Sequence, residues 1–445
     1  MNILLIGQCS LHWGRMEFGN IGNYYIIEPL VRELRATFPG CAIRTTLQMT
    51  EGFCAREGVE VLPMELYYGW ASGELATVRS ELASSEAIRS TGRVEVTTPY
   101  IDAVLWADLV IDFSGDIWGD NADLLGPDRF LIGLLKDRIA MNLDKPVVML
   151  AGSPGPFSNP ETSALAKKVY ADFSLVTNRE PISTELLQRD GFDVSKTLSL
   201  ACPAFLFEPS QGEEMEELLL REGIVDGSGE RDRPLVGFVL CGWNFPVGPF
   251  DRWPREDAEY AVFADAVQYL TDTLGARVCL MSHSNGFEVP PPTPFVLKHG
   301  RDYPVMKQLQ RVLDSRGIPA GRYFVLDGVY DAWQTKGIIG RFDMLVSGRV
   351  HAAVAGLSQC VPTVIMDYGH EPKAHKLLGF ATVAGAENYV ADPADAGDLI
   401  ARIDRCWRER DAYRDWLRQR MPEVAQAARH NFQVLKGLFR SKESA

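Results

Sequence analysis

Short apolar runs alternate with stretches of helical spacing along most of the chain. The runs at residues 109–113 and 146–151 are almost continuously apolar, which is typical of strands buried on both faces of a parallel sheet. Apolar residues recur at helical spacing from Ile26 to Phe38, and Pro29 within this stripe predicts a helix that bends or starts late. The strands expected in the first half lie at residues 3–6, 42–46, 59–63, 109–113, 146–151, 174–176 and 197–201.

A polar, acidic and glycine-bearing stretch at residues 209–233 divides this pattern in two. We interpret it as a linker with one helix inside it. Two α/β units of similar size predict two Rossmann-like domains, residues 1–208 and 234–396, that face each other across a cleft. Residues 397–445 are expected to form C-terminal helices that could cross back to the first domain, and residues 70–100 a helix-containing insertion. The strands expected in the second half lie at residues 235–240, 278–282, 323–326, 344–346 and 363–366.

The charge balance and cysteine pattern narrow the class of protein. The chain has 445 residues, with 59 acidic and 45 basic side chains and a formal net charge of -14, which argues against nucleic-acid binding. No stretch approaches the roughly 20 apolar residues of a membrane-spanning helix, so no transmembrane segment is expected. The eight cysteines are scattered without a CxxC pair, which favours buried free thiols in a reducing cytoplasm.

An Arg-x-His pair near the carboxyl end is the most informative candidate for chemistry. The apolar run at residues 342–347 leads into Arg349 and His351 and then into a small-residue helix. Side chains at positions i and i+2 of a strand point the same way, so we expect both groups to converge at the end of a strand beside a helix N-terminus. That position favours an anion such as a phosphate. The structural alternative is that Arg349 pairs with a structural carboxylate and that His351 caps the helix.

Other polar residues follow expected strands or open expected helices, so they could share the same sheet edges. For each of them, turn formation, helix capping or a surface ion pair is the ordinary alternative. No metal site is expected, because the seven histidines lack ligand spacing, and neither a dinucleotide fingerprint nor a P-loop is present. These further candidates are Asn20, Asn23, Asp116, Ser153, Arg179, His283, Tyr368 and Lys373.

Six short motifs carry a resemblance to a known family. They lie at residues 19–23, 114–116, 152–157, 178–183, 203–205 and 347–352. The motifs occur in the same order as in the polysaccharide pyruvyl transferase family, which the chain resembles over roughly residues 1–385. The sequence departs from the family pattern at Asn23, where an aspartate is common, and at Cys202, which replaces another aspartate. It also departs at Asp116, where a glycine is frequent, and at Gly152, which replaces a common glutamine.

The resemblance implies two Rossmann-like domains arranged as in GT-B glycosyltransferases. It also implies transfer of pyruvyl from phosphoenolpyruvate to a sugar of a polysaccharide or glycan, with formation of a pyruvate ketal and release of phosphate. Arg349 and His351 match the family's phosphoenolpyruvate-binding and catalytic pair, and His351, with an ordinary pKa of about 6.5, is expected to exchange the proton. Donor binding is assigned to Arg179, Arg349, Lys373, His283 and Tyr368, and acceptor or loop contacts to Asn20, Asn23, Asp116 and Ser153.

The scheme requires no cofactor beyond phosphoenolpyruvate as co-substrate. The first domain is the expected acceptor side and the second the donor side. We expect a cytoplasmic protein, and a lipid-linked acceptor would place it at the inner face of the membrane. Two alternatives stay open. One is a GT-B glycosyltransferase with a nucleotide-sugar donor, and the other is a non-catalytic anion- or glycan-binding protein, which the departures at Asn23 and Cys202 suggest.

Overall fold

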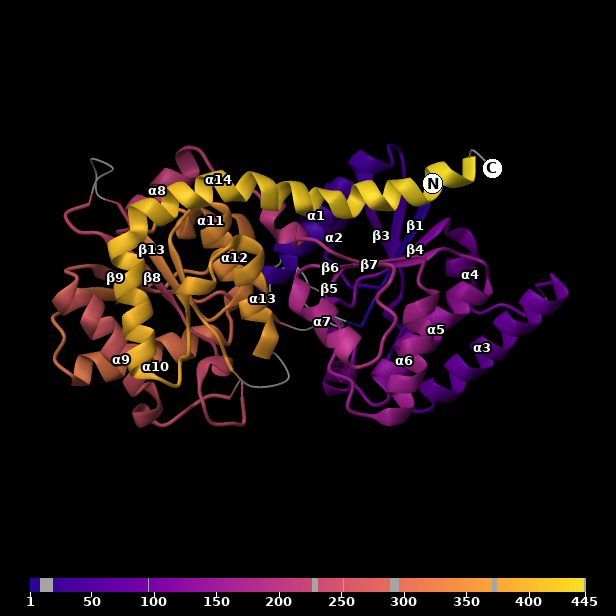
Figure 1. Ribbon diagram of the computed structural model, residues 1–445, viewed down its shortest axis with the longest axis horizontal. Helices are drawn as coiled ribbons and strands as arrows, with labels where there is room; N and C mark the ends of the chain where they lie inside the picture. The colour runs from indigo at the N-terminus through magenta and orange to yellow at the C-terminus, as the bar shows by residue number, and fades with distance from the viewer. Residues whose placement is uncertain are drawn as a thin grey trace. The chain divides into compact units, whose positions relative to one another are not determined.

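The computed structural model describes residues 1–8, 19–94, 96–225, 231–250, 252–288, 296–369 and 374–443. The chain divides into two compact units, each discontinuous in sequence. Unit 1 comprises the described residues within Met1–Met16, Glu28–Cys202 and Ala427–Ala445. Unit 2 comprises those within Glu17–Ile27 and Pro203–Gln426. Figure 1 colours the chain by residue number, so the indigo-to-magenta elements belong mainly to unit 1.

The described part of unit 1 contains one sheet of seven strands, and every strand pair in it is parallel. The strand order is β3-β2-β1-β4-β5-β6-β7, so the order reverses between β1 and β4, the kind of switch point at which α/β sheets bind ligands. All seven strands match runs predicted from the sequence. The strands are β1 (Asn2–Ile6), β2 (Ala42–Thr45), β3 (Val59–Val61), β4 (Leu109–Asp112), β5 (Val147–Gly152), β6 (Leu175–Asn178) and β7 (Thr197–Ser199).

Helices connect the strands of unit 1, and α3 and α4 account for the predicted insertion. Helix α1 begins at Ile21 and continues through Pro29, so it does not begin late. Burial of Tyr25, Leu30 and Leu34 outweighs the roughly 3 kcal/mol that an interior proline costs. The helices are α1 (Ile21–Thr37), α2 (Glu51–Glu57), α3 (Glu74–Thr91), α4 (Pro99–Trp106), α5 (Arg129–Asn142), α6 (Pro160–Asp172) and α7 (Pro181–Arg189).

The main sheet of unit 2 has six described strands, also paired in parallel, in the order β12-β9-β8-β13-β14-β15. All but the two-residue β15 match predicted runs. These strands are β8 (Leu235–Val239), β9 (Arg277–Leu280), β12 (Tyr323–Val325), β13 (Met344–Ser347), β14 (Thr363–Met366) and β15 (Val390–Ala391), with a separate antiparallel pair β10 (Asn285–Gly286) and β11 (Lys298–His299).

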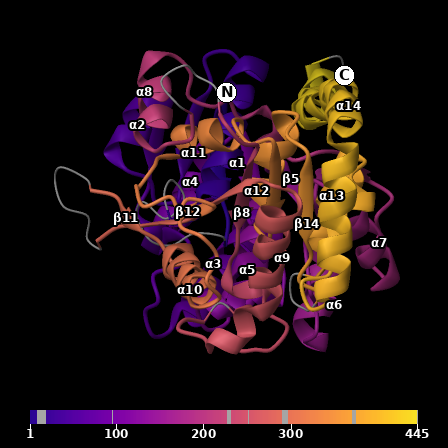
Figure 2. The same ribbon diagram turned by 90° about the vertical axis from the view of Figure 1, so that its left-hand side faces the viewer.

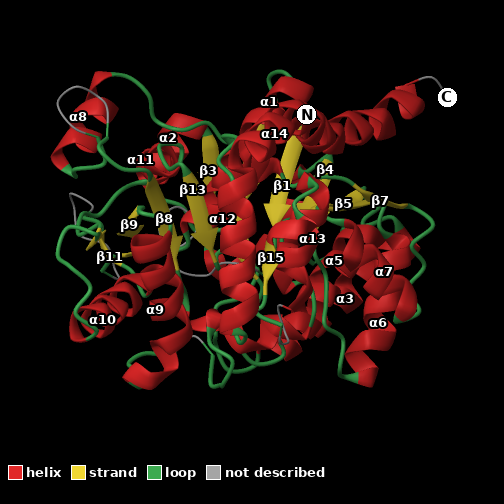
Figure 3. Cartoon of the chain, turned by 60° about the vertical axis from the view of Figure 1, so that its left-hand side comes forward, coloured by secondary structure: helices red, strands yellow, loops and turns green. Residues whose placement is uncertain are grey.

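Helices flank these strands, as the red and yellow ribbons of Figure 3 show. Helix α12 contacts both α11 and α13, whereas α9 contacts α10 (Figure 2). Right-handed crossovers place these two groups on opposite faces of the sheet. The helices of unit 2 are α8 (Glu213–Arg221), α9 (Ala261–Gln268), α10 (Asp302–Ser315), α11 (Ala332–Ile339), α12 (Val350–Ser358) and α13 (Ala374–Ala384).

The C-terminal segment is a single helix, α14 (Ala396–Glu443), which continues through Pro422. Its residues up to Gln426 belong to unit 2, and those that follow belong to unit 1. Within unit 1, the buried side chain of Asn431 donates to the backbone oxygen of Ala201 (2.9 Å) and accepts from the hydroxyl of Thr177. Among the described helices, none is both long and apolar enough to pass through a bilayer.

Candidate functional site

Arg349 and His351 lie at the N-terminus of a helix and not on a strand. Strand β13 ends at Ser347, Arg349 is the N-cap of α12, and His351 lies in the first turn of that helix. The Ser347 hydroxyl ends the strand locally, because it accepts the Arg349 N–H (3.1 Å) and donates to the Arg349 backbone oxygen (3.0 Å). The predicted i, i+2 strand geometry is therefore wrong, although the predicted placement beside a helix N-terminus is confirmed.

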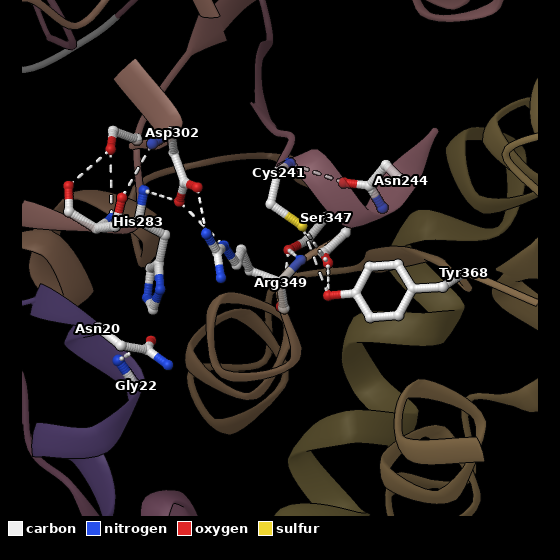
Figure 4. A network of polar contacts seen from close by, with 12 residues as sticks. Asn20, Gly22, Cys241, Asn244, His283, Asp302, Ser347, Arg349 and Tyr368 are labelled. Atoms are coloured by element: carbon white, nitrogen blue, oxygen red, sulfur yellow. Dashed lines mark hydrogen bonds and ion pairs between the residues drawn. The ribbon is translucent and has the colours of Figure 1, made fainter. Parts of the chain in front are cut away.

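The Arg349 side chain forms a buried ion pair with Asp302, the first residue of α10 (Figure 4). Nε lies 3.0 Å from one carboxylate oxygen, and Nη2 donates to the other. Burial by itself would lower the pKa of the Arg349 guanidinium, but the charge and hydrogen bonds of Asp302, together with Cys241 and Tyr368, raise this pKa well above its ordinary value. Arg349 is therefore paired with a buried carboxylate, as the structural alternative proposed. Within the described residues, Nη1 remains without a hydrogen-bond partner.

His283 lies against this ion pair. Its backbone N–H donates to the Asp302 carboxylate (3.3 Å), and its ring meets the ring of Tyr25 edge to face at 5.5 Å. The side chain is buried, and neither ring nitrogen has a hydrogen-bond partner in the part of the chain that the structure describes. Burial and then the charge of Arg349 lower the pKa of His283 to about 3. His283 is therefore a neutral imidazole at physiological pH, with one N–H to donate.

Tyr368 and Cys241 hold the turn that presents Arg349. The Tyr368 hydroxyl donates to the Gly348 backbone oxygen (2.6 Å), and the Cys241 sulfur lies 3.6 Å from both oxygens. The Asn244 side chain accepts the Cys241 N–H (2.8 Å) and occupies the space beside Gly348, where an added Cβ would come within 1.9 Å of it. The ends of β8 and β14 therefore fix the backbone between Ser347 and Arg349.

The glycine-asparagine loop lies against His351. A Cβ on Gly22 would come within 2.4 Å of the His351 Nδ1 atom, so only glycine fits at this position. The Asn20 side chain accepts the Gly22 N–H (3.2 Å), and its backbone oxygen accepts the N–H of Asn23 (2.9 Å). Asn20 thus caps α1, as its capping alternative proposed. The His351 ring also meets the Phe380 ring edge to face at 5.7 Å.

Three other predicted residues converge in unit 1. Arg179 follows β6, Ser153 follows β5, and Asp116 lies in the turn after β4, so all three lie at the carboxyl edge of the sheet. The buried Arg179 side chain donates from Nε to the Ser153 hydroxyl (2.7 Å), and its Nη2 lies 3.9 Å from the Asp116 carboxylate. Lys373, the last candidate, lies outside the described residues.

Sequence reasoning missed Asp302, Cys241 and Asn244. Cys241 and Asn244 directly follow the predicted strand 235–240, the same position that marked the other candidates, so this signal was available. Asp302 carried no such signal, because its partner Arg349 lies 47 residues away in the sequence. In the described chain, no group of three or more His, Cys, Asp or Glu side chains is placed to hold a metal ion.

A buried pair of acidic residues in unit 1 consists of Asp112 on β4 and Asp137 on α5. The Ser114 N–H donates to one oxygen of Asp112 (2.6 Å), and the Trp118 indole donates to one oxygen of Asp137 (3.4 Å). The remaining oxygen of each carboxyl has no other donor among the described residues, and the two carboxyl groups interact with each other, so we infer that they share a proton. Burial raises the pKa of Asp112 to about 6 and that of Asp137 well above its ordinary value.

Asp137→Asn should raise the free energy of unfolding at pH 8 by about 1–3 kcal/mol. Both folded pKa values exceed the unfolded value of about 3.9, so the stability that the pair contributes is fully present below pH 4 and falls as pH rises through about 6. An asparagine amide donates permanently to Asp112 and removes this loss. Urea unfolding from pH 4 to 8 would measure the change, with the exposed Asp102→Asn as the matched control. An unchanged pH profile in Asp137→Asn would show that no proton is shared.

Comparisons with known proteins identify the family and the fold type of the chain. A family model described as polysaccharide pyruvyl transferase matches residues 20–370. The amylovoran biosynthesis protein AmsJ of Erwinia amylovora is 30% identical over 317 residues, which cover 70% of this chain and 68% of AmsJ. Anabaena HepE, solved in complex with UDP and glucose, matches with a TM-score of 0.58 at 13% identity over 98% of this chain and 100% of HepE. A glycosyltransferase from Rickettsia africae matches with a TM-score of 0.57 at 12% identity over 98% of each chain. At these identities, the two structures show the fold alone, which is of the GT-B type.

Proposed function

We propose, from the premise that this chain belongs to the polysaccharide pyruvyl transferase family, that it transfers pyruvyl from phosphoenolpyruvate to sugar hydroxyls of a polysaccharide or glycan. Membership makes the chain a transferase of polysaccharide pyruvylation. The identity of the donor, the formation of a ketal and a free or lipid-linked acceptor are the proposed parts.

One observation supports the donor assignment above the others. His283 is buried with two ring nitrogens that have no hydrogen-bond partner in the described structure, and it shares the Asp302 carboxylate with Arg349. A buried polar group without a partner is costly unless a ligand satisfies it. The neutral His283 N–H and the Arg349 Nη1 can donate to two oxygens of an anion, and only Arg349 contributes charge.

The Arg349–Asp302 ion pair limits the positive charge that Arg349 and His283 together offer to an anion. Asp302 offsets the guanidinium, so the pair attracts an anion mainly through its oriented N–H groups. Phosphoenolpyruvate carries about three negative charges and needs further cations. Lys373 is our candidate for this role, and the predicted contribution of Arg179 to donor binding stays a prediction. Tyr368 acts through the Gly348 oxygen and positions Arg349.

The proposed reaction assigns the proton transfers to His351. Protonation of the donor at C3 makes C2 electrophilic, and a sugar hydroxyl adds to C2 and loses its proton to the base. The bond between C2 and the bridging oxygen then breaks, phosphate leaves with that electron pair, and a second hydroxyl adds with loss of its proton to close the ketal. His351 lies in the first turn of α12 against the 20–23 loop, so Asn20 and Asn23 are the proposed acceptor contacts near it. Asp116 and Ser153 are the corresponding proposals in unit 1.

Phosphoenolpyruvate should raise the melting temperature of the protein by several degrees at a concentration about 100-fold above its dissociation constant. A ligand that binds only the native state stabilises it, so a thermal-shift titration together with a phosphate-release assay tests donor choice. UDP-glucose serves as the comparison ligand. A shift with UDP-glucose and none with phosphoenolpyruvate would reject the pyruvyl donor.

The second candidate function is a glycosyltransferase that uses a nucleotide sugar. The observation in its favour is the fold match to HepE, whose structure contains UDP and glucose. The match shows the fold alone, so the titration above decides between the two donors.

A further inference from the structure

A surface tryptophan in unit 1 has an unusual setting. Trp70 is 36% exposed, although large aromatic residues are commonly buried. Its backbone has φ of 56°, in the left-handed region that a bulky residue rarely adopts. A strained residue persists only where its surroundings hold it.

Hydrogen bonds on both sides of Trp70 hold it in place. The carboxylate of Glu74 accepts the N–H groups of Gly69 and of Ala71, the two residues that flank Trp70. The Trp70 indole N–H donates to the Leu125 backbone oxygen (2.7 Å). These bonds fix the ring plane before any ligand arrives, so binding loses little side-chain entropy.

The loop that contains Trp70 is tied to the segment that precedes α5. The Tyr68 hydroxyl donates to the Pro127 oxygen (2.9 Å), and the Tyr68 and Trp70 rings meet edge to face at 5.7 Å. A Cβ on Gly126 would come within 2.4 Å of the Tyr68 hydroxyl, so this close approach requires glycine. Beside Leu125, the side chain of Leu124 is 76% exposed. Two apolar side chains are therefore presented to solvent by a rigid support.

The loop that contains Trp70 is connected through Arg129 to the carboxyl edge of the sheet in unit 1. The buried Arg129 guanidinium lies 4.4 Å from the Tyr68 ring centre, and its Nε donates to the backbone oxygen of Gln8 (3.1 Å). Gln8 follows β1, one of the two strands at the switch point of the sheet. Parallel sheets bind ligands at this edge, so Trp70 lies close to the expected substrate-binding side.

We propose that Trp70 and Leu124 form a stacking platform for one sugar ring of the acceptor glycan. The assignment rests on the proposed function in taking a glycan as the acceptor. One face of a sugar ring carries C–H groups that pack on a flat indole, while its hydroxyls bind water or polar side chains. The exposed carboxylates of Asp123 and Asp128 adjoin the platform in sequence and can accept hydrogen bonds from sugar hydroxyls. Their negative charge disfavours phosphate groups, so the occupant is an uncharged sugar unit and not the anionic donor.

Calorimetric titration of the full chain with uncharged gluco- and galacto-oligosaccharides tests the platform. We expect Trp70→Ala to weaken binding about tenfold and Trp70→Tyr, which keeps an aromatic ring, to weaken it less than threefold. Leu124→Ser, at a position that is 76% exposed, should weaken binding about threefold. Trp416→Ala removes another exposed tryptophan, on α14 in unit 2, and should leave binding unchanged.

The titration contains no phosphoenolpyruvate, so its result is independent of whether pyruvyl is the group transferred. Sugar binding with no phosphate release from phosphoenolpyruvate would keep the platform and reject the proposed donor. Equal affinity in the wild-type protein and in Trp70→Ala would overturn the platform. No sugar binding by the wild-type protein would also overturn it, and so would a loss of self-association in Trp70→Ala, which would identify the surface as a contact between copies of the chain.

Discussion

Arg349→Ala should lower the free energy of unfolding by about 3–5 kcal/mol and abolish measurable donor binding. The substitution leaves the fully buried Asp302 carboxylate without its bidentate partner, and an uncompensated buried charge is costly. It also removes the Nη1 group that we assign to the donor. Urea unfolding and calorimetric titration with phosphoenolpyruvate would measure the two effects separately.

The double variant Arg349→Ala with Asp302→Asn separates stability from function. Asparagine removes the buried charge, so the double variant should recover at least half of the lost stability. Donor binding should remain absent, because neither substitution restores the guanidinium. Recovery of donor binding in the double variant would show that Arg349 serves only to neutralise Asp302.

His351→Ala should slow pyruvyl transfer by about 10²–10⁴-fold, the range typical of a lost general acid or base. The donor affinity should change less than threefold, because the proposed seat of the donor consists of other residues. Steady-state rates and thermal shifts with phosphoenolpyruvate would measure this split. The exposed His430 on α14 supplies the matched control, since His430→Ala should leave both quantities unchanged. A wild-type rate in His351→Ala would remove the histidine from the mechanism.

The strands were predictable because each buried strand carries its own local signal. The continuous apolar runs of β4 and β5 can bury all their side chains only in a sheet that is covered on both faces. Strand β15 consists of Val390 and Ala391 alone, which is too short for any periodicity. Asp112 interrupts the apolar run of β4, but the sequence cannot show that Asp137, 25 residues later on α5, interacts with it. Such pairings between distant residues exist only once the chain has folded.

In the candidate site too, some features have a local sequence signal and others depend on the folded chain. Arg179, Ser153 and Asp116 were each predicted from a strand end, and the parallel sheet brings them together. The geometry at Arg349 was predicted wrongly, because Gly348 and the Ser347 hydroxyl turn the chain into α12 two residues earlier than the apolar run suggested. Local pattern therefore predicted which strand ends carry the candidate residues, whereas the hydrogen bonds that orient their side chains depend on long-range packing.

Helix α14 has a consequence for how the protein can be made in the cell. Unit 1 needs Asn431 to satisfy Thr177 and Ala201, and unit 2 needs residues 19–27 from near the start of the chain. During synthesis, the ribosome releases the α14 segment of unit 1 only after it has made residues 203–426 of unit 2. Unit 1 therefore has an incomplete core while residues 203–426 of unit 2 emerge. A fragment that stops at Cys202 would lack the contacts of Asn431 with Thr177 and Ala201.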